Sequence, residues 1–144
     1  KYFSYIHMID PVIKRMAARG QGNIVNVVGN GGKVASAIHI PGGAANAALM
    51  LASAGLATAY AAQGIRVNAV CPAGTWTPML RTWAAEQPDP AGVSQYLDDI
   101  HPLGYCPDGD VIADACAFLL SSKARFITGH IMHVSGGAEI GYRR

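Results

Sequence analysis

The sequence predicts an α/β fold built on a parallel β-sheet. Three short apolar runs rich in β-branched residues alternate with longer segments that have helical spacing. Apolar strands joined through helices are typical of a parallel sheet. We expect right-handed crossovers between these strands. Three strands make a narrow sheet, so we also expect further strands of the same domain to precede this segment.

The composition limits the classes of protein to be considered. The 144 residues are 51% hydrophobic and 14% charged, which excludes a disordered chain and suits one domain. Lys and Arg number 11 against 9 Asp and Glu, and this near balance offers no basic surface for nucleic acid. The 3 cysteines have neither disulfide nor zinc-site spacing, which favours a cytoplasmic protein.

The N-terminal half predicts a helix, a strand and a second helix. Residues 2–19 have helical spacing with an interruption expected at Asp10-Pro11, and residues 23–29 (NIVNVVG) predict a buried strand. Residues 43–62 are alanine-rich, carry no charge and are long enough for one helix. Their small side chains suit a helix buried between close neighbours better than a lipid-facing span, so we expect no membrane partner.

The C-terminal half predicts two more strands with helices between them. Residues 64–72 (GIRVNAVCP) predict the second strand and residues 130–134 the third. Short helices are expected at residues 78–85 and 93–100. A longer amphipathic helix follows Asp108–Asp110, and its expected apolar face consists of Val111, Ile112, Ala115, Phe118 and Leu119.

Several motifs, taken in order, resemble the short-chain dehydrogenase/reductase family. They are GNIVNVVG, the uncharged helix, GIRVNAVCPAGTWTPML and PLGYCPDGDVIADACAFLLSSKARFITGHIMHVSGG. The resemblance covers residues 1–137 of this chain, which correspond to the second half of the proteins in that family. It implies a Rossmann-like doubly wound parallel sheet of which this chain supplies the last three strands only. Residues 1–144 would then be the C-terminal part of a single NAD(P)-binding domain, whose pyrophosphate fingerprint precedes them.

The resemblance also implies catalytic residues that this chain lacks. In the family that this chain resembles, a serine, a tyrosine and a lysine exchange a proton with the substrate while hydride passes to or from the nicotinamide. The lysine follows the tyrosine by four residues, which places both on one helix face. These three positions fall on Gly29, Gly42 and Asn46, respectively. A glycine cannot exchange a proton, and the amide of asparagine carries no charge.

Lys1, His39 and Asn46 are the candidate catalytic residues that remain. Lys1 aligns near the asparagine of the family's relay and carries a positive charge. His39 lies three residues before Gly42, and imidazoles exchange protons near neutral pH. The alternative for His39 is an exposed loop residue without a catalytic role. Asn46 is also a candidate to hydrogen-bond the cofactor ribose.

The loop after the second strand is the other candidate part of a cofactor site. By resemblance its backbone and a threonine hydroxyl contact the nicotinamide amide, and a purely structural turn is the alternative. The family's glycine after the proline is Ala73 here. The candidate residues are Pro72, Ala73, Gly74, Thr75 and Thr77.

Other chemically active side chains support weaker hypotheses. His130 and His133 are three residues apart on a strand and point to opposite faces, so we expect no metal. Cys71 ends a buried strand, where we expect a small apolar side chain rather than a nucleophile. Four aromatic residues either line an apolar substrate pocket or pack within a lid: Trp76, Trp83, Tyr96 and Tyr105.

The resemblance therefore implies an oxidoreductase that uses NAD or NADP and acts on a small alcohol or carbonyl compound. The helix that begins near Lys1 and the helix 43–62 correspond to helices that pair between subunits in the family, which implies a homodimer or homotetramer. A second hypothesis is a catalytically degenerate member that serves as a binding or scaffolding subunit. The glycines at positions 29 and 42 favour this second hypothesis, and the loop 72–77 favours the enzyme.

Overall fold

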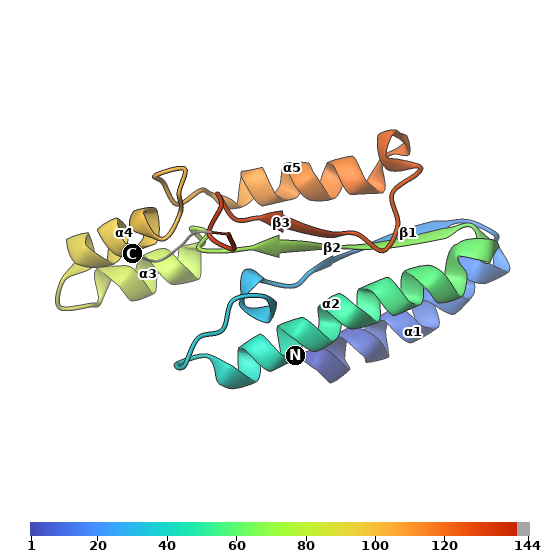
Figure 1. Ribbon diagram of the computed structural model, residues 1–144, viewed down its shortest axis with the longest axis horizontal. Coiled ribbons are helices and arrows are strands. Elements are labelled where there is room, and N and C mark those ends of the chain that lie inside the picture. The colour runs from blue at the N-terminus through green and yellow to red at the C-terminus, as the bar shows by residue number, and fades with distance from the viewer. Residues whose placement is uncertain (141–144) are drawn as a thin grey trace.

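The computed structural model describes residues 1–140 and has a three-stranded parallel sheet at its centre. The strands lie in the order β1 (Gly22–Val27), β2 (Ile65–Pro72) and β3 (Ile131–Val134). One face of the sheet is covered by α1 (Tyr2–Ala18) and α2 (Ile40–Tyr60), and the other by α5 (Gly109–Leu120) (Figure 1). The predicted α/β fold with helices on both faces is confirmed.

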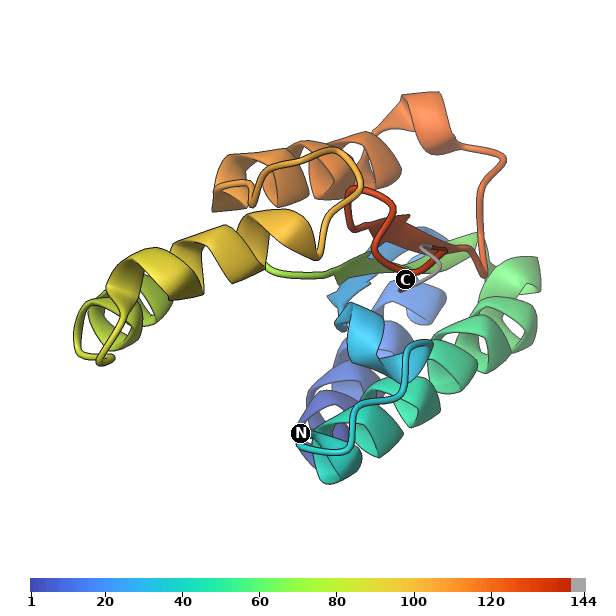
Figure 2. The same ribbon diagram turned by 60° about the vertical axis from the view of Figure 1, so that its left-hand side comes forward.

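The strand register brings the carboxyl ends of all three strands to one edge. β1 pairs with β2 from Gly22 and Ile65 to Val27 and Val70, and β2 pairs with β3 as far as Pro72 and Val134. Beyond this edge lie the short helix η1 (Asn30–Gly32) and the helices α3 (Pro78–Ala85) and α4 (Pro90–Asp99). Figure 2 shows α3 and α4 reaching away from the body of the molecule.

The two crossovers between strands have opposite hands. The strands are neighbours in chain order, yet α2 and α5 lie on opposite faces of the sheet (Figure 1). Leu49 of α2 packs with Cys71 on one face of β2, whereas Leu119 of α5 packs with Val70 on the other. The expectation that both crossovers are right-handed is therefore wrong. The second connection contains α3 and α4 as well as α5, and this length allows the chain to change faces at the carboxyl edge.

α1 is a single helix that continues through Pro11. The expected interruption at Asp10-Pro11 does not occur. Ile9 and Ile13 flank the proline, are 8% and 1% exposed, and pack in one cluster with Val67 of the sheet. Their burial holds the helix in place on both sides of the hydrogen bond that the proline removes.

α2 begins at Ile40, earlier than predicted, because Pro41 suits a first turn whose backbone N–H groups have no partner in the helix. Its buried residues are Asn46, Leu49, Ser53 and Ala57. The Ser53 hydroxyl accepts a hydrogen bond from Asn26 of β1 at 2.9 Å. The opposite side of α2 is open within residues 1–140, where Leu51 is 77% exposed.

Residues 1–140 contain one helical segment, Ile40–Gln63, that is long enough and apolar enough to cross a membrane. It comprises α2 and the short helix η2 (Ala61–Gln63). This property rests on length and composition alone. The buried polar side chains of α2 accept hydrogen bonds: Asn46 from Lys1, which precedes α1, and Ser53 from Asn26 of β1.

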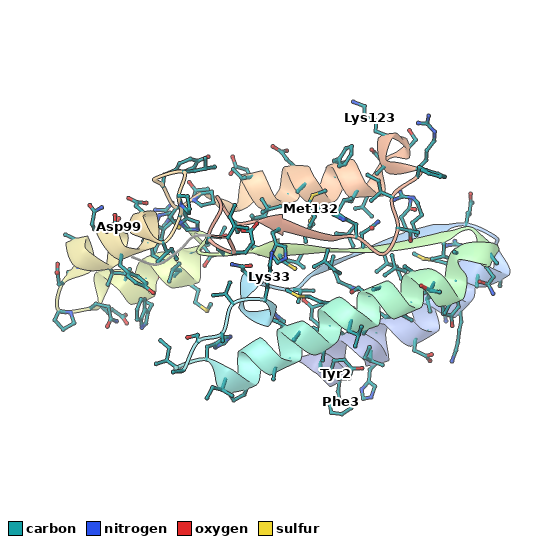
Figure 3. All side chains as sticks on the ribbon, in the orientation of Figure 1. Tyr2, Phe3, Lys33, Asp99, Lys123 and Met132 are labelled. Atoms are coloured by element: carbon teal, nitrogen blue, oxygen red, sulfur yellow. The ribbon has the colours of Figure 1, made fainter. Side chains whose placement is uncertain are left out.

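α5 uses a narrower apolar face than predicted. Ile112 and Leu119 are buried, but Val111 and Phe118 are 38% and 40% exposed. Met132 of β3 packs against this cluster between the strand and α5 (Figure 3). The helix therefore contacts the sheet along one stripe, and the flanks of that stripe face outward.

Candidate functional site

Lys1 and Asn46 meet at the carboxyl edge of the sheet. The first turn of α1 lies beside the first turns of α2 in both views (Figures 1 and 2). The Lys1 ammonium donates hydrogen bonds to Asn46 Oδ1 at 2.6 Å and to the carbonyl oxygen of Val28. Partial burial lowers the pKa of Lys1 from its usual value. The structure thus brings together two of the three predicted catalytic residues, which are 45 positions apart in the sequence.

Gly29 shapes the space beside this pair. Its φ of 124° is a backbone conformation that residues with side chains rarely adopt. A Cβ atom at this position would lie 3.0 Å from Asn46 Nδ2. The amide of Asn46 therefore points at the position where a serine side chain would begin, while its oxygen is held by Lys1.

His39 lies over Gly42. It precedes the first residue of α2, and its backbone oxygen accepts a hydrogen bond from Gly43 at 2.8 Å. A Cβ atom on Gly42 would collide with the imidazole ring of His39. The ring thus takes the volume in which the side chain of a larger residue at position 42 would start. His39 is also exposed to solvent, which agrees with the alternative interpretation of this histidine as a loop residue without a catalytic role.

An open hollow of about 320 Å³ lies between η1 and the first turns of α2. His39 lines this hollow together with Lys33 and Ala47. Its volume is at the lower end of the range found for small-molecule sites. His39 therefore has access to a space that a small molecule can enter.

Cys71 links the Lys1 pair to the loop after β2. The backbone of Gly29 and the charge of Lys1 both act to lower the pKa of its thiol. Burial nevertheless raises the pKa of the thiol, which keeps it protonated. The side chain is fully buried in the core, so the interpretation of Cys71 as a small apolar residue is confirmed.

The loop that follows Pro72 is anchored at both ends. Pro72 pairs with Val134 of β3, and the backbone N–H of Trp76 donates to Pro107 at 2.8 Å. The Thr77 hydroxyl accepts from the N–H of Leu80 at 3.1 Å and so caps α3. Thr77 therefore has a structural role in this conformation. Ala73, Gly74 and Thr75 form the part of the loop next to the carboxyl edge.

The four aromatic residues that were candidates for a substrate pocket or a lid do not form a closed pocket in the described structure. Trp83, Tyr96 and Tyr105 are 50%, 60% and 53% exposed. Trp76 instead stacks under the guanidinium of Arg81, whose carbon lies 4.9 Å from the ring centre. Arg81 also forms an ion pair with Asp108 at 2.5 Å, which ties α3 to the start of α5.

Asn30 and His133 form a polar pair that the sequence analysis missed. His133 Nδ1 donates to Asn30 Oδ1 at 2.9 Å, since the amide oxygen can only accept. Burial and the nearby charge of Lys33 lower the pKa of His133. The sequence signal that could have pointed to this pair is Asn30, a polar residue that directly follows Gly29 at the end of a buried strand. No cluster of three or more metal-binding side chains occurs in the described part of the chain.

Known proteins are similar to this chain in sequence and in fold. Residues 1–139 match the family model described as enoyl-(acyl carrier protein) reductase. The chain is 37% identical over 131 residues to an A-factor type gamma-butyrolactone 1'-reductase of Streptomyces virginiae, covering 90% of this chain and 50% of that protein. The chain belongs to the short-chain dehydrogenase/reductase family. The resemblance noted in the sequence is thereby confirmed.

Solved structures of the family agree with this fold. Thermoplasma acidophilum aldohexose dehydrogenase has a TM-score of 0.90 at 27% identity, over 99% of this chain and 58% of that one. A gluconate 5-dehydrogenase from Burkholderia cenocepacia, solved with NADP and tartrate, has a TM-score of 0.84 at 26% identity over 93% of this chain and 51% of that one. The chain spans about half the length of the curated relatives it matches. The predicted Rossmann-like fold class is confirmed.

Proposed function

We propose that this chain is the C-terminal part of an oxidoreductase that uses NAD or NADP to interconvert a small alcohol and its carbonyl compound. The observation that carries the proposal is the Lys1–Asn46 pair at the carboxyl edge of the parallel sheet. Ligands of open α/β sheets bind outside this edge. The family relationship and the NADP-bound neighbour support a nicotinamide cofactor.

The residues present fit the nicotinamide half of such a cofactor. The backbone of Ala73–Thr75 offers amide and carbonyl groups, and Asn46 Nδ2 makes no hydrogen bond to any residue in the range 1–140. When bound, the cofactor would supply or accept hydride. The polar groups of this chain would orient the ribose and the substrate oxygen next to it.

We assign three roles to the side chains of this site. Asn46 Nδ2 donates a hydrogen bond to the substrate oxygen or to the ribose, in the space that Gly29 leaves open. Lys1 fixes the orientation of Asn46 and stabilises negative charge on that oxygen. His39 exchanges the proton of the substrate hydroxyl with solvent, because its ring lies over Gly42 and borders the hollow.

The test is a titration of the intact protein with NADH and with NADPH, followed by turnover assays on a panel of small carbonyl compounds. Tight binding of one cofactor together with turnover supports the proposal. Cofactor binding without turnover on the panel would favour the degenerate binding subunit instead, and failure to bind either cofactor would contradict a nicotinamide enzyme.

Substitution of His39 with alanine is expected to lower kcat by about 100-fold, the usual contribution of a general acid or base. The matched control is Ile38→Ala, because Ile38 is its neighbour and is 98% exposed. We expect the control to keep the wild-type rate in steady-state assays of the intact protein. Equal values of kcat for His39→Ala and wild type would show that His39 is an exposed loop residue without a catalytic role.

We also propose that the intact protein is a cytoplasmic homodimer or homotetramer that pairs through α1 and α2. Large apolar side chains of α1 are exposed: Phe3 is 71% exposed and points outward from the helix (Figure 3), and Met8 is 72% exposed. Burial of such side chains between subunits is favourable. Sedimentation of the intact protein tests this assembly, and a monomer would contradict it.

A further inference from the structure

His101 is a buried histidine that the roles assigned above do not use. It follows α4 and is 2% exposed. Its Nδ1 atom lies 2.6 Å from the backbone oxygen of Leu97. Its other ring nitrogen, Nε2, is buried and has no hydrogen-bond partner among the described residues. Buried polar atoms are rarely left unpaired, so this atom requires an explanation.

The hydrogen bond to Leu97 places a hydrogen atom on Nδ1 of the ring. A carbonyl oxygen accepts hydrogen bonds and cannot donate, so Nδ1 carries the proton. In the neutral ring, Nε2 is then an acceptor with a free lone pair. It needs a donor, and a buried water molecule or a backbone N–H is the kind of group that provides one.

The surroundings of the ring show where this acceptor points. A Cβ atom on Gly74 would lie 2.9 Å from His101 Cε1, and one on Gly136 would lie 3.4 Å from Cδ2. These two carbons are the ring neighbours of Nε2. Nε2 therefore lies on the edge of the ring between the carbon next to Gly74, in the loop after β2, and the carbon next to Gly136, in the turn after β3.

Both backbone segments approach the ring because they lack side chains there. Gly136 has a φ of 57°, and its carbonyl oxygen accepts from the N–H of Leu103 at 3.1 Å. The N–H of Gly104 donates to the carbonyl oxygen of His101 at 2.7 Å. The histidine thus sits at the centre of a junction that joins the end of α4, the loop 72–77 and the turn 135–137.

We propose that His101 is a positioning residue that holds the loop 72–77 in place through a bound water molecule, which donates a hydrogen bond to Nε2 and a second one to the backbone of that loop. The functional consequence rests on the function proposed above, because this loop would contact the nicotinamide. Loss of the imidazole would remove this contact from the middle of the loop, between its anchors at Pro72 and Trp76. The cofactor would then have to order Ala73–Thr75 when it binds, and its affinity would fall.

The experiment compares His101→Phe with wild type in the intact protein, by amide hydrogen exchange without cofactor. Phenylalanine retains a ring but has neither nitrogen. We expect exchange at residues 73–76 to become about tenfold faster, a difference of about 1.4 kcal/mol in local opening, while residues 65–71 of β2 keep their protection. His101→Gln supplies an acceptor near the position of Nε2 and is expected to restore part of the protection.

Leu119→Ala is the matched control, since Leu119 of α5 is fully buried and lies in a different cluster, with Val70 of β2. It lowers global stability without touching the loop, so its exchange at residues 73–76 should follow that of the whole domain. Wild-type protection of the loop in His101→Phe, or equal selective loosening in Leu119→Ala, would overturn the positioning role.

A cofactor titration separates this inference from the proposed function. We expect His101→Phe to raise the dissociation constant for NADH or NADPH about tenfold and to raise KM for the cofactor more than it lowers kcat. Selective loosening of the loop in a protein that binds no nicotinamide would support the positioning role and contradict the proposed function. An unchanged dissociation constant in a loosened loop would overturn the link between His101 and cofactor affinity.

Discussion

Replacement of Lys1 with methionine in the intact protein is expected to lower kcat/KM by about 100-fold or more, the usual loss when a group that stabilises charge in the transition state is removed. The substitution removes the only ammonium bonded to Asn46 within the described residues and leaves the orientation of that amide undefined. Steady-state kinetics with the better cofactor measure the effect.

Lys14→Met provides the matched control for this substitution. Lys14 lies on the same helix, far from the site, and forms an exposed ion pair with Asp10 at 2.8 Å. Such pairs contribute little to stability, so the control should retain wild-type kinetics. A Lys1→Met enzyme as active as the Lys14→Met enzyme would show that Lys1 takes no part in the reaction.

The pH dependence should follow the same ammonium. Burial lowers the pKa of Lys1, so in the folded protein its proton leaves at a lower pH than that of a free lysine. The charged form is the active one in our proposal. Activity should therefore fall on the alkaline side, below the ordinary value of 10.5. Lys1→Arg keeps its charge, so in this variant the alkaline fall should disappear; an unchanged profile would contradict the assignment.

Substitution of Gly32 with alanine is expected to destabilise the protein by about 1–3 kcal/mol, as overpacking of a close contact usually does. A Cβ atom there would lie 2.7 Å from the backbone nitrogen of Ala47 and 2.8 Å from the carbonyl carbon of Asn46. Backbone atoms of a helix cannot move aside as a flexible side chain can. η1 would therefore be displaced from α2, and Asn30 with it. Equilibrium unfolding in urea measures the loss.

Gly55→Ala is the control of opposite sign. Gly55 lies on the exposed side of α2, and a Cβ atom there would meet nothing within 4 Å. Alanine in a helix interior is favoured over glycine by roughly 0.5–1 kcal/mol, so this variant should unfold at a higher urea concentration. If Gly32→Ala were as stable as Gly55→Ala, the close approach of η1 to α2 would not constrain the structure.

The strands and most helices were predictable because each depends on local pattern. The β-branched run at residues 24–28 and the glycine before Ile65 mark strands whether or not their partners are known. The continuity of α1 was not predictable, because the neighbours that support Pro11 are buried against residues of the sheet. The opposite hands of the two crossovers depend on where α5 packs, and the sequence pattern carries no sign of that choice.

The candidate site likewise has a part that the sequence predicts and a part that only the fold shows. Lys1, His39 and Asn46 were identified from their chemistry and their resemblance to family positions, yet only the fold shows that Lys1 reaches Asn46 or that the ring of His39 covers Gly42. The pairing of Asn30 with His133 joins residues 103 positions apart. His101 attracted no attention in the sequence, since its unpaired nitrogen exists only in the packed structure.

The sequence by itself determined the class of fold, the position of the strands and the family, because hydrophobic period, turn residues and motif order are local properties of the chain. The tertiary structure alone decided which polar atoms converge at the carboxyl edge and which face of the sheet each helix covers. Those outcomes depend on contacts between residues distant in the chain, and such contacts exist only once the apolar faces of α1, α2 and α5 have packed onto the sheet.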